Sequence, residues 1–418
     1  MVLKTENLEI EGKVIKRNIE NILYKELNND EVLTLVGARQ VGKTTLLYKI
    51  RDHLEKQGQT AGFLTLEDKF LLTDLNGHPK NIFNYINLPG DEKKKYFLLI
   101  DEIQYLDDPS NFLKYTYDLY KDRIKLIVTG SSAFYIDKKY KDSLAGRKKI
   151  IRISPLTFTE FLVAKGEQEL SESVKAGKLL KPEKDKVSIY YREYFKFGGY
   201  PKAVLKNELN EKIEVLKELY LSFLKKDILE SGVKNEIKFY ELLRLLAAQS
   251  GSLLNINELS NTLNISREAV ENYIYIMEKG FIIRLIRPFH SNIRKELGKM
   301  PKVYFLDTGY RNTVLNNYDD IEIRPDKGES LENSLFISLY NRTSDIDEIK
   351  FWRTKDNNEV DFIVQEKAAY EVKFNRNNFN PKKYEAFTNL YTNIPLNCVS
   401  YSKNYRNEEG LTIFDFLG

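Results

Sequence analysis

The sequence predicts an α/β protein whose N-terminal part is built on a doubly wound parallel sheet. Short apolar runs that are typical of buried strands alternate with segments of helical periodicity. Two of these runs end directly in polar residues, at "LVGARQVGKTT" and at "FLLIDEIQ". Ligands of open parallel sheets bind at the carboxyl ends of the strands. These two junctions therefore predict a binding site as well as a fold.

The first run, residues 31–36, leads into the spacing G-x-x-x-x-G-K-T and then into an apolar helical segment. This is the phosphate-binding loop pattern in the strand–loop–helix context that the motif requires. Its glycines let backbone N–H groups converge on a polyphosphate at the positive end of a helix. We expect Lys43 to contact the β- and γ-phosphates and Thr44 to bind Mg²⁺. The loop residues expected at the nucleotide are Gly37, Ala38, Arg39, Gln40, Val41, Gly42, Lys43, Thr44 and Thr45.

The second run, Tyr96–Ile100, ends in the acidic pair Asp101-Glu102. We expect Asp101 to hold Mg²⁺, directly or through water, and Glu102 to polarise the attacking water. An acidic pair after a strand is also common as a plain solvated loop. Combined with the phosphate loop, the pair predicts an ATPase that uses ATP and Mg²⁺.

Three further segments complete the expected sheet. Residues 59–68 are predicted to form a strand, and a short strand at 150–153 follows Arg147. A strand within 123–134 ends in small polar residues, which places Ser131 or Ser132 near the γ-phosphate or the attacking water. A helix N-cap is the competing interpretation for either serine.

Length and composition restrict the class of protein. A chain of 418 residues suggests about three modules. A net charge of +4 means that any surface for nucleic acid must be local. One cysteine, Cys398, and three histidines exclude a disulfide framework and a Cys/His zinc site. The charged N-terminus does not predict a signal peptide, and no apolar run reaches the roughly 20 residues of a membrane span, so we expect a cytoplasmic protein with no membrane partner.

The middle of the chain is predicted to be helical. Residues 165–187 are charged and indicate an exposed helical insertion or linker. Residues 191–205 indicate helix, turn and helix, with Gly198-Gly199 and Pro201 at the turn. Residues 241–289 give a helix, a short helix, a turn at 264–267, a longer helix capped by Ser266 and a strand-like segment, the order of a winged helix-turn-helix.

This predicted winged helix has two interpretations. Its third helix could read DNA through Arg267 and Asn272, but Glu268 and Glu271 oppose phosphate, and such folds also serve as protein-docking modules. A better basic cluster lies in the wing and the residues after it, although solvated lysines without a common role remain the alternative. The members of this predicted basic cluster are Arg284, Arg287, His290, Arg294, Lys295, Lys299 and Lys302.

The C-terminal part carries a second group of candidate residues. A helix at 328–342 is expected to turn Glu332 toward its apolar side, and strands are expected at 350–353, 359–364 and 369–374. Asp361 lies in the second strand, and Glu371 and Lys373 share one face of the third. Such a set can bind one or two Mg²⁺ ions and orient a water for phosphodiester attack. A half-exposed hairpin with alternating charges is the alternative, but buried carboxylates need a partner or a metal.

The ordered motifs resemble a widespread prokaryotic group of AAA+-type P-loop ATPases with a C-terminal domain of unknown function. The likeness covers residues 17–375, and its segments are "LVGARQVGKTTLL", "FLLIDEIQYL", "LIVTGSSAF", "LAGRKKIIRISPLTFTEFL", "GGYP", "PKVYFLDTG", "GESLEN" and "FWRTKDNNEVDFIV…AYEVKF". The resemblance implies an AAA+ core, a helical lid, a winged helix and a C-terminal domain similar to restriction-endonuclease-like nucleases. It further implies that Arg147 acts as an arginine finger toward a neighbouring subunit and that Pro201 lies near the nucleotide.

We therefore predict four domains, at residues 1–165, 166–237, 238–315 and 316–418. The leading hypothesis is Mg²⁺-dependent ATP hydrolysis coupled to DNA binding or remodelling, by a homo-oligomer that could be a ring. A second hypothesis is an ATP-controlled signalling or defence switch whose C-terminal domain is a docking module. A third is an ATP-gated, metal-dependent nuclease that uses Glu332, Asp361, Glu371 and Lys373.

Overall fold

The computed structural model of the protein divides into two compact units, Met1–Ser154 with Lys279–Phe281, and Pro155–Glu278 with Ile282–Gly418. Each unit is described by itself. The predicted boundary at residue 165 lies close to this division, and the four-domain organisation stays a prediction. The structure describes residues 15–130, 146–223, 233–289, 296, 299–343, 345–354, 356, 358–401 and 410–418.

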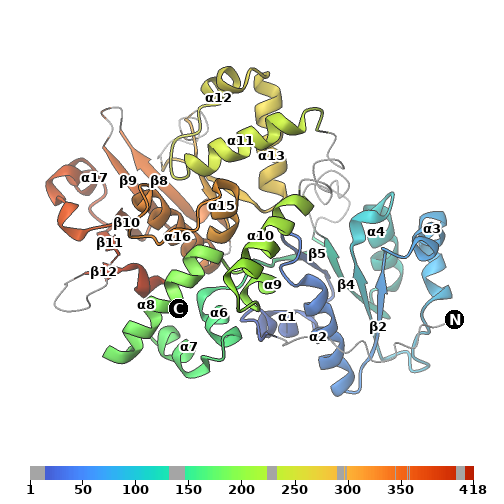
Figure 1. Ribbon diagram of the computed structural model, residues 1–418. Helices are drawn as coiled ribbons and strands as arrows, with labels where there is room; N and C mark the ends of the chain where they lie inside the picture. The colour runs from blue at the N-terminus through green and yellow to red at the C-terminus, as the bar shows by residue number, and fades with distance from the viewer. Residues whose placement is uncertain are drawn as a thin grey trace. The chain divides into compact units, whose positions relative to one another are not determined.

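The first unit contains a five-stranded sheet with the order β2-β3-β4-β1-β5, in which every pairing is parallel (Figure 1). Every residue of β1 and of β4 is buried, which explains why both strands are mostly apolar, although Thr34 in β1 and Lys125 in β4 are buried polar residues. The predicted parallel sheet is confirmed. Its strands are β1 (Val32–Val36), β2 (Thr60–Thr65), β3 (Tyr96–Asp101), β4 (Ile124–Gly130) and β5 (Lys148–Arg152).

Helices pack beside this sheet, and Figure 1 shows α2 and α4 next to its strands. They are α1 (Glu20–Glu26), α2 (Lys43–Lys56), α3 (Lys69–Gly77) and α4 (Pro109–Tyr120). Helix α2 starts at the end of the phosphate-loop motif and buries Leu46, Leu47 and Ile50. Helix α3 starts where Asp68 accepts hydrogen bonds from the backbone N–H groups of Phe70 and Leu71.

The second unit begins with a helical region. Its helices are α6 (Phe158–Ala164), α7 (Gln168–Lys175), α8 (Lys181–Phe197), α9 (Pro201–Val204), α10 (Leu209–Phe223) and α15 (Thr308–Leu315). The charged stretch at 165–187 is helical, as predicted. Asp307 is buried before α15 and accepts hydrogen bonds from the N–H groups of Gly199, at 2.7 Å, and Tyr310, at 2.8 Å. The turn between α8 and α9 is therefore fixed against the start of α15.

Three helices and a two-stranded antiparallel sheet follow one another in the order expected for residues 241–289. They are α11 (Glu236–Ala248), α12 (Ile256–Leu263), α13 (Arg267–Lys279), β6 (Ile283–Ile286) and β7 (Lys302–Phe305). The turn before α13 contains Asn264 in the left-handed region, at φ 52°. Ser266 accepts a hydrogen bond from the N–H of Ala269, so the predicted helix cap is confirmed.

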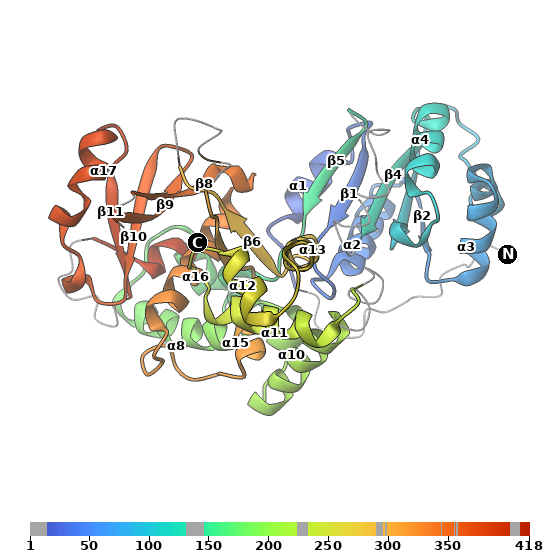
Figure 2. The ribbon, with the colours of Figure 1, turned by 90° about the horizontal axis from the view of Figure 1, so that it is seen from above.

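The C-terminal part is a mixed five-stranded sheet with the order β12-β11-β10-β9-β8 and with α16 against β10 (Figure 2). The pairings β8–β9 and β9–β10 are antiparallel, whereas β10–β11 and β11–β12 are parallel. The three predicted strands and the helix before them are confirmed, and the last two strands were not predicted. The elements are α16 (Lys327–Arg342), β8 (Ile349–Arg353), β9 (Glu359–Val364), β10 (Ala368–Lys373), α17 (Glu385–Leu390), β11 (Leu396–Ser400) and β12 (Leu411–Thr412).

Close packing at the second residue of α15 leads to a stability prediction. A Cβ built on Gly309 would lie 2.2 Å from the carbonyl oxygen of Phe197, whereas one built on Gly328, the second residue of α16, meets no atom within 4 Å. We expect Gly309→Ala to lower the free energy of unfolding by about 1–3 kcal/mol because backbone must move. Gly328→Ala is the matched control and should raise it by up to about 1 kcal/mol. Urea unfolding of both variants measures the difference, and equal effects would contradict this packing.

Candidate functional site

The phosphate-loop motif connects β1 to α2 in the first unit. Gly42 is the N-cap of α2 and has a φ of 97°, a left-handed conformation that residues with a Cβ rarely adopt. Gln40 also has a positive φ, at 61°. The loop therefore turns sharply over the first turn of α2, where unpaired backbone N–H groups and the helix dipole favour an anion.

Lys43 is buried inside this loop, with 5% of its surface exposed. Its Nζ donates hydrogen bonds to the carbonyl oxygens of Gly37, at 3.0 Å, and Ala38, at 2.9 Å. The ammonium is thus fixed inside the curve of the loop by the loop's own backbone. A phosphate that enters the loop would meet a positive charge already in position.

The two residues predicted to hold Mg²⁺ are brought together. Thr44 Oγ1 donates to Asp101 Oδ2 at 2.8 Å, although the two residues are 57 positions apart in the sequence. Burial raises the pKa of Asp101 above its ordinary value, and hydrogen bonds from Thr129 and Thr44 act in the opposite direction. A hydroxyl and a carboxylate at the end of a buried strand are oxygen ligands of the kind that Mg²⁺ takes.

Thr129 was not predicted as a site residue. Its hydroxyl donates to Asp101 Oδ1 and accepts from the backbone N–H of Glu102 at 3.0 Å. Glu102 has a φ of 57°, and its carboxylate accepts a hydrogen bond from Gln104 Nε2. The acidic pair is therefore held in one arrangement by β4. The threonine near the end of the strand "LIVTG" was the signal in the sequence that could have identified Thr129. The prediction chose Ser131 instead, and Ser131 lies outside the described residues.

Arg17 is a second residue that sequence reasoning missed. It is buried, and its guanidinium donates to the carbonyl oxygens of Val41, at 2.9 Å, and Ser154, at 2.7 Å. One side chain thus fixes the phosphate-loop backbone to the segment after β5. In the sequence, α1 and β1 separate Arg17 from the loop motif. The charged stretch around Arg17 has no pattern that indicates contact with the loop.

The remaining predicted residues lie elsewhere. Arg147 precedes β5; its carbonyl accepts from the N–H of Val32 at 2.8 Å, and its Nε pairs with Asp118 at 2.9 Å. Val32 starts β1, and the phosphate loop follows the end of β1. Arg147 therefore lies at the amino-terminal ends of the strands, whereas the loop of its own chain lies at their carboxyl ends. Pro201 starts α9 in the second unit, and its predicted position near a nucleotide stays a prediction.

The second unit brings four carboxylates into one region, here called the carboxylate cluster: Glu332, Glu359, Asp361 and Glu371. Burial together with repulsion from Asp361 raises the pKa of Glu332 to about 8 and that of Glu371 to about 7. Lys373 Nζ donates to Glu371, so the predicted shared face is confirmed. Asp361 is buried and accepts from the N–H of Val372 at 2.8 Å.

The prediction that Lys302 belongs to an exposed basic cluster is wrong. Lys302 has 1% of its surface exposed, and its Nζ lies 2.6 Å from Glu359 and 3.0 Å from Glu332. Lys302 and Val303 point to opposite faces of β7. The carboxylates on the face of Lys302 compensate the cost of burying its charge. Lys299 is exposed, as expected, whereas His290, Arg294 and Lys295 lie outside the described residues. In the described parts of the chain, no three His, Cys, Asp or Glu side chains are arranged so that they could hold a metal ion.

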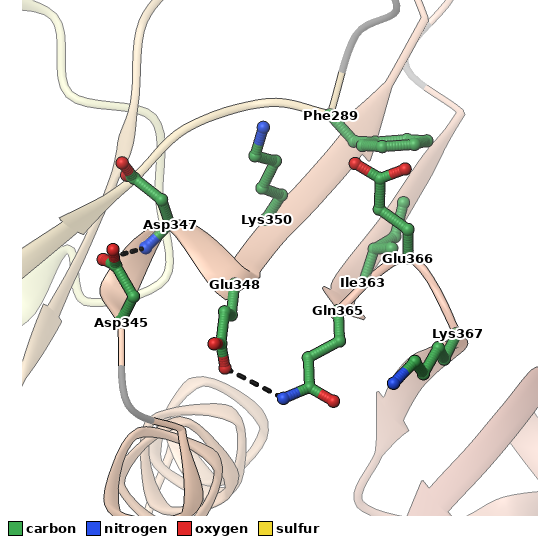
Figure 3. Close-up of a pocket in the computed structure, with 9 residues that line it drawn as sticks. All are labelled: Phe289, Asp345, Asp347, Glu348, Lys350, Ile363, Gln365, Glu366 and Lys367. Atoms are coloured by element: carbon green, nitrogen blue, oxygen red, sulfur yellow. Dashed lines mark hydrogen bonds between the residues drawn. The ribbon is translucent and has the colours of Figure 1, made fainter.

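An open pocket of about 560 Å³ lies elsewhere in the second unit (Figure 3). The acidic residues Asp345, Asp347, Glu348 and Glu366 outnumber Lys350 and Lys367 in its lining, which also contains Phe289, Ile363 and Gln365. Gln365 Nε2 donates to Glu348 Oε2 at 2.9 Å, which the figure shows as a dashed line. None of the predicted site residues lines it, and its excess of acidic residues does not suit a phosphate group.

Comparison with protein families divides the chain into three matched regions. Residues 29–162 match the family described as AAA domain. Residues 189–320 and residues 327–414 each match a domain of unknown function. The AAA match covers the five strands and the phosphate loop, and the parallel sheet is of the kind found in AAA+ P-loop ATPases.

Relatives of similar length are uncharacterized. A protein of Methanocaldococcus jannaschii is 28% identical over 418 residues, which cover 97% of this chain and 88% of that protein. A protein of Haemophilus influenzae is 28% identical over 84% of each chain. Among solved structures, PCH-2 from C. elegans is similar at a TM-score of 0.33 and 15% identity, over 62% of this chain and 70% of that one. So low a TM-score supports no inference about function.

The described residues include no helix with the length and apolar character needed to cross a membrane. Residues 29–162 are therefore similar to the AAA domain family, and the parallel sheet of the first unit is like that of AAA+ P-loop folds.

The contacts of Arg17 lead to a prediction about the loop. Arg17→Ala should weaken binding of a non-hydrolysable ATP analogue and destabilise the first unit, because it removes two charge-assisted hydrogen bonds worth about 1.5–3 kcal/mol each. Arg51→Ala is the matched control, since Arg51 pairs with Glu55 on the surface of α2 and such pairs contribute about 1 kcal/mol or less. Calorimetric titration of both variants checks this. Unchanged affinity in Arg17→Ala would show that the loop keeps its shape without the guanidinium.

Proposed function

We propose that this protein is an Mg²⁺-dependent ATPase whose nucleotide cycle is coupled to DNA binding. The hydrogen bond from Thr44 to Asp101 carries the first part of the proposal. It joins the last residue of the phosphate-loop motif to the carboxylate at the end of β3, a buried strand separated from β1 by β4. Two elements that are far apart in sequence thus meet where a nucleotide-bound cation would lie.

Each residue of this site has a distinct role in the proposal. Backbone N–H groups of the loop and the ammonium of Lys43 bind and orient the phosphates. Thr44 and Asp101 would hold Mg²⁺, which neutralises charge on the phosphate oxygens when bound. Glu102, anchored by Gln104 and Thr129, orients and polarises the attacking water.

The DNA part of the proposal rests on the three helices and the two-stranded sheet of residues 236–305. A short helix, a left-handed turn residue and a capped longer helix precede an antiparallel pair, as in winged helices. Arg267 and Asn272 are exposed on α13, the helix that would enter a groove.

One observation favours a docking module as the second candidate for this region. Glu268 and Glu271 are exposed on the same helix, and Lys302 is buried instead of contributing to a basic wing. Carboxylates facing a DNA backbone oppose binding electrostatically. The same surface suits a protein partner with mixed charges, in which case ATP state would control assembly.

The ATPase rate of the full chain, measured without DNA and with duplex, single-stranded and branched DNA, tests the proposal. Lys43→Ala should lose binding or turnover, because it removes the positive charge that contacts the β- and γ-phosphates. Glu102→Gln should bind ATP and lose most turnover, since it keeps its shape but no longer activates water. Lys56→Ala, which removes an exposed ion pair on the same helix, is the control and should leave the rate unchanged.

Two results would count against the proposal separately. Wild-type turnover in Glu102→Gln would remove the assigned role of this acid. An ATPase rate that no DNA changes, together with no DNA binding, would favour the docking module and leave the ATPase assignment standing.

We further propose that Arg147 acts on the nucleotide of a neighbouring subunit in a homo-oligomer. Arg147 lies at the amino-terminal ends of the strands and its own phosphate loop at their carboxyl ends, and this separation supports action between subunits. Arginine fingers contribute on the order of 10³-fold or more to turnover. Mixing Arg147→Ala with Lys43→Ala protein should therefore restore part of the activity, because one competent interface can form from two defective chains. If the mixture is as inactive as its components, Arg147 is only a partner of Asp118.

A further inference from the structure

A single buried lysine contacts three of the four members of the carboxylate cluster. Lys302 Nζ lies 2.6 Å from Glu359 Oε1, 3.0 Å from Glu332 Oε1 and 3.5 Å from Asp361 Oδ1. Burial by itself lowers the pKa of Lys302, but attraction to these carboxylates raises it well above the ordinary value. The side chain is therefore an ammonium at neutral pH, and it lies between three carboxylates from α16 and β9.

The cluster still has an oxygen without a partner. Glu371 accepts hydrogen bonds through Oε1 from Tyr384, at 2.8 Å, and from Lys373. Its Oε2 is buried and has no hydrogen-bond partner among the residues that the structure describes. A buried carboxylate oxygen without a partner is costly. The cluster thus has more acceptor oxygens than the lysines around it can satisfy.

The lysine and the carboxylates come from different matched regions. Lys302 lies on β7, within residues 189–320, whereas all four carboxylates lie within 327–414. The turn between α11 and α12 approaches the same place, since a Cβ on Gly251 would lie 3.1 Å from Glu332 Oε1. The N–H of Gly251 also donates to Val303 at 2.8 Å. The three-helix region therefore covers Glu332 at two points.

These contacts do not fit a divalent cation held by the same oxygens. Mg²⁺ and Ca²⁺ need several oxygens at about 2.0–2.6 Å, and the ammonium already lies among three of those available. Among the described residues, no three His, Cys, Asp or Glu side chains lie close enough together to hold a metal ion. Of the residues in the nuclease-like pattern, Glu332 and Asp361 contact Lys302, and Glu371 contacts Lys373.

We propose that Lys302 takes the place of a divalent cation in the carboxylate cluster, so that strand β7 closes a latent metal site. Removal of the lysine charge should convert the cluster into a site for one divalent cation. Asp361 would be a ligand, and the free oxygen of Glu371 the second. This proposal does not depend on the ATPase or on DNA binding.

The test compares Mn²⁺ binding to full-length wild-type protein and to Lys302→Met, which keeps the aliphatic stem and removes the charge. Titration followed by electron paramagnetic resonance of free Mn²⁺ counts the sites without any activity assay. We expect Lys302→Met to bind one Mn²⁺ more than wild type. The added site should be lost with Asp361→Asn and kept with Asp101→Asn, which separates it from the nucleotide site. Lys350→Met, which removes a lysine of β8 that pairs with Glu296, is the matched control and should gain none.

Thermal unfolding gives a second readout. Mn²⁺ at about 100 times its Kd should raise the unfolding midpoint of Lys302→Met by roughly 5 °C and leave that of Lys350→Met at the wild-type value. Lys302→Met leaves Glu332 and Asp361 without their lysine, whereas Glu359 still pairs with Arg353, and the variant can fail to fold for that reason. The double variant Lys302→Met/Glu359→Gln removes one negative charge with the positive one and keeps Glu332, Asp361 and Glu371.

Each outcome either supports or overturns the proposal about Lys302. An extra Mn²⁺ site in either folded variant, or refolding of either only when Mn²⁺ is present, supports the proposal. Three results overturn it: a wild-type Mn²⁺ site that Asp361→Asn removes, folded variants that gain no site, or variants that stay unfolded with and without Mn²⁺. In the last two cases Lys302 is a structural counter-ion only.

Discussion

The position of the Asp101 carboxylate is the constraint on which the rest of the first unit's site depends. Its two oxygens accept from Thr44 at the start of α2 and from Thr129 on β4, while Asp101 itself ends β3. The parallel register of β3 and β4, with Ile100 beside Val128, brings these side chains together. One carboxylate therefore aligns the ends of three neighbouring elements, and any shift of register between the strands would separate the cation ligands from the loop.

Much of this arrangement could be predicted because its physical causes are local. Buried parallel strands are mostly apolar on both faces, so β1, β3 and β4 appear as short segments rich in apolar residues. The loop spacing is set by backbone geometry that needs Gly42 at a positive φ. In the C-terminal sheet, Asp361 within an apolar strand indicated a buried carboxylate that needs a partner. In each case the pattern and its cause lie within a few residues of each other.

The residues that were missed act over long distances in sequence. Arg17 reaches Ser154, and nothing near Arg17 indicates that contact. Lys302 was predicted to be solvated because lysines usually are, and only the fold shows three carboxylates beside it. Strands β11 and β12 are short, and β11 pairs with β10 and β12 with β11 in parallel, so no hairpin turn marks them. Tertiary charge compensation and parallel pairing leave little local pattern.

The place of β1 between β4 and β5 has a consequence for how the chain is made on the ribosome. β1 is the first strand synthesised, yet its partners are β4 and β5, the last two strands of the sheet. At roughly 5–20 residues per second, β1 waits on the order of ten seconds for both neighbours. Until β4 and then β5 have emerged, the backbone groups of β1 lack partners on one or both sides. The strand that later carries the nucleotide loop is thus open to wrong pairing during synthesis.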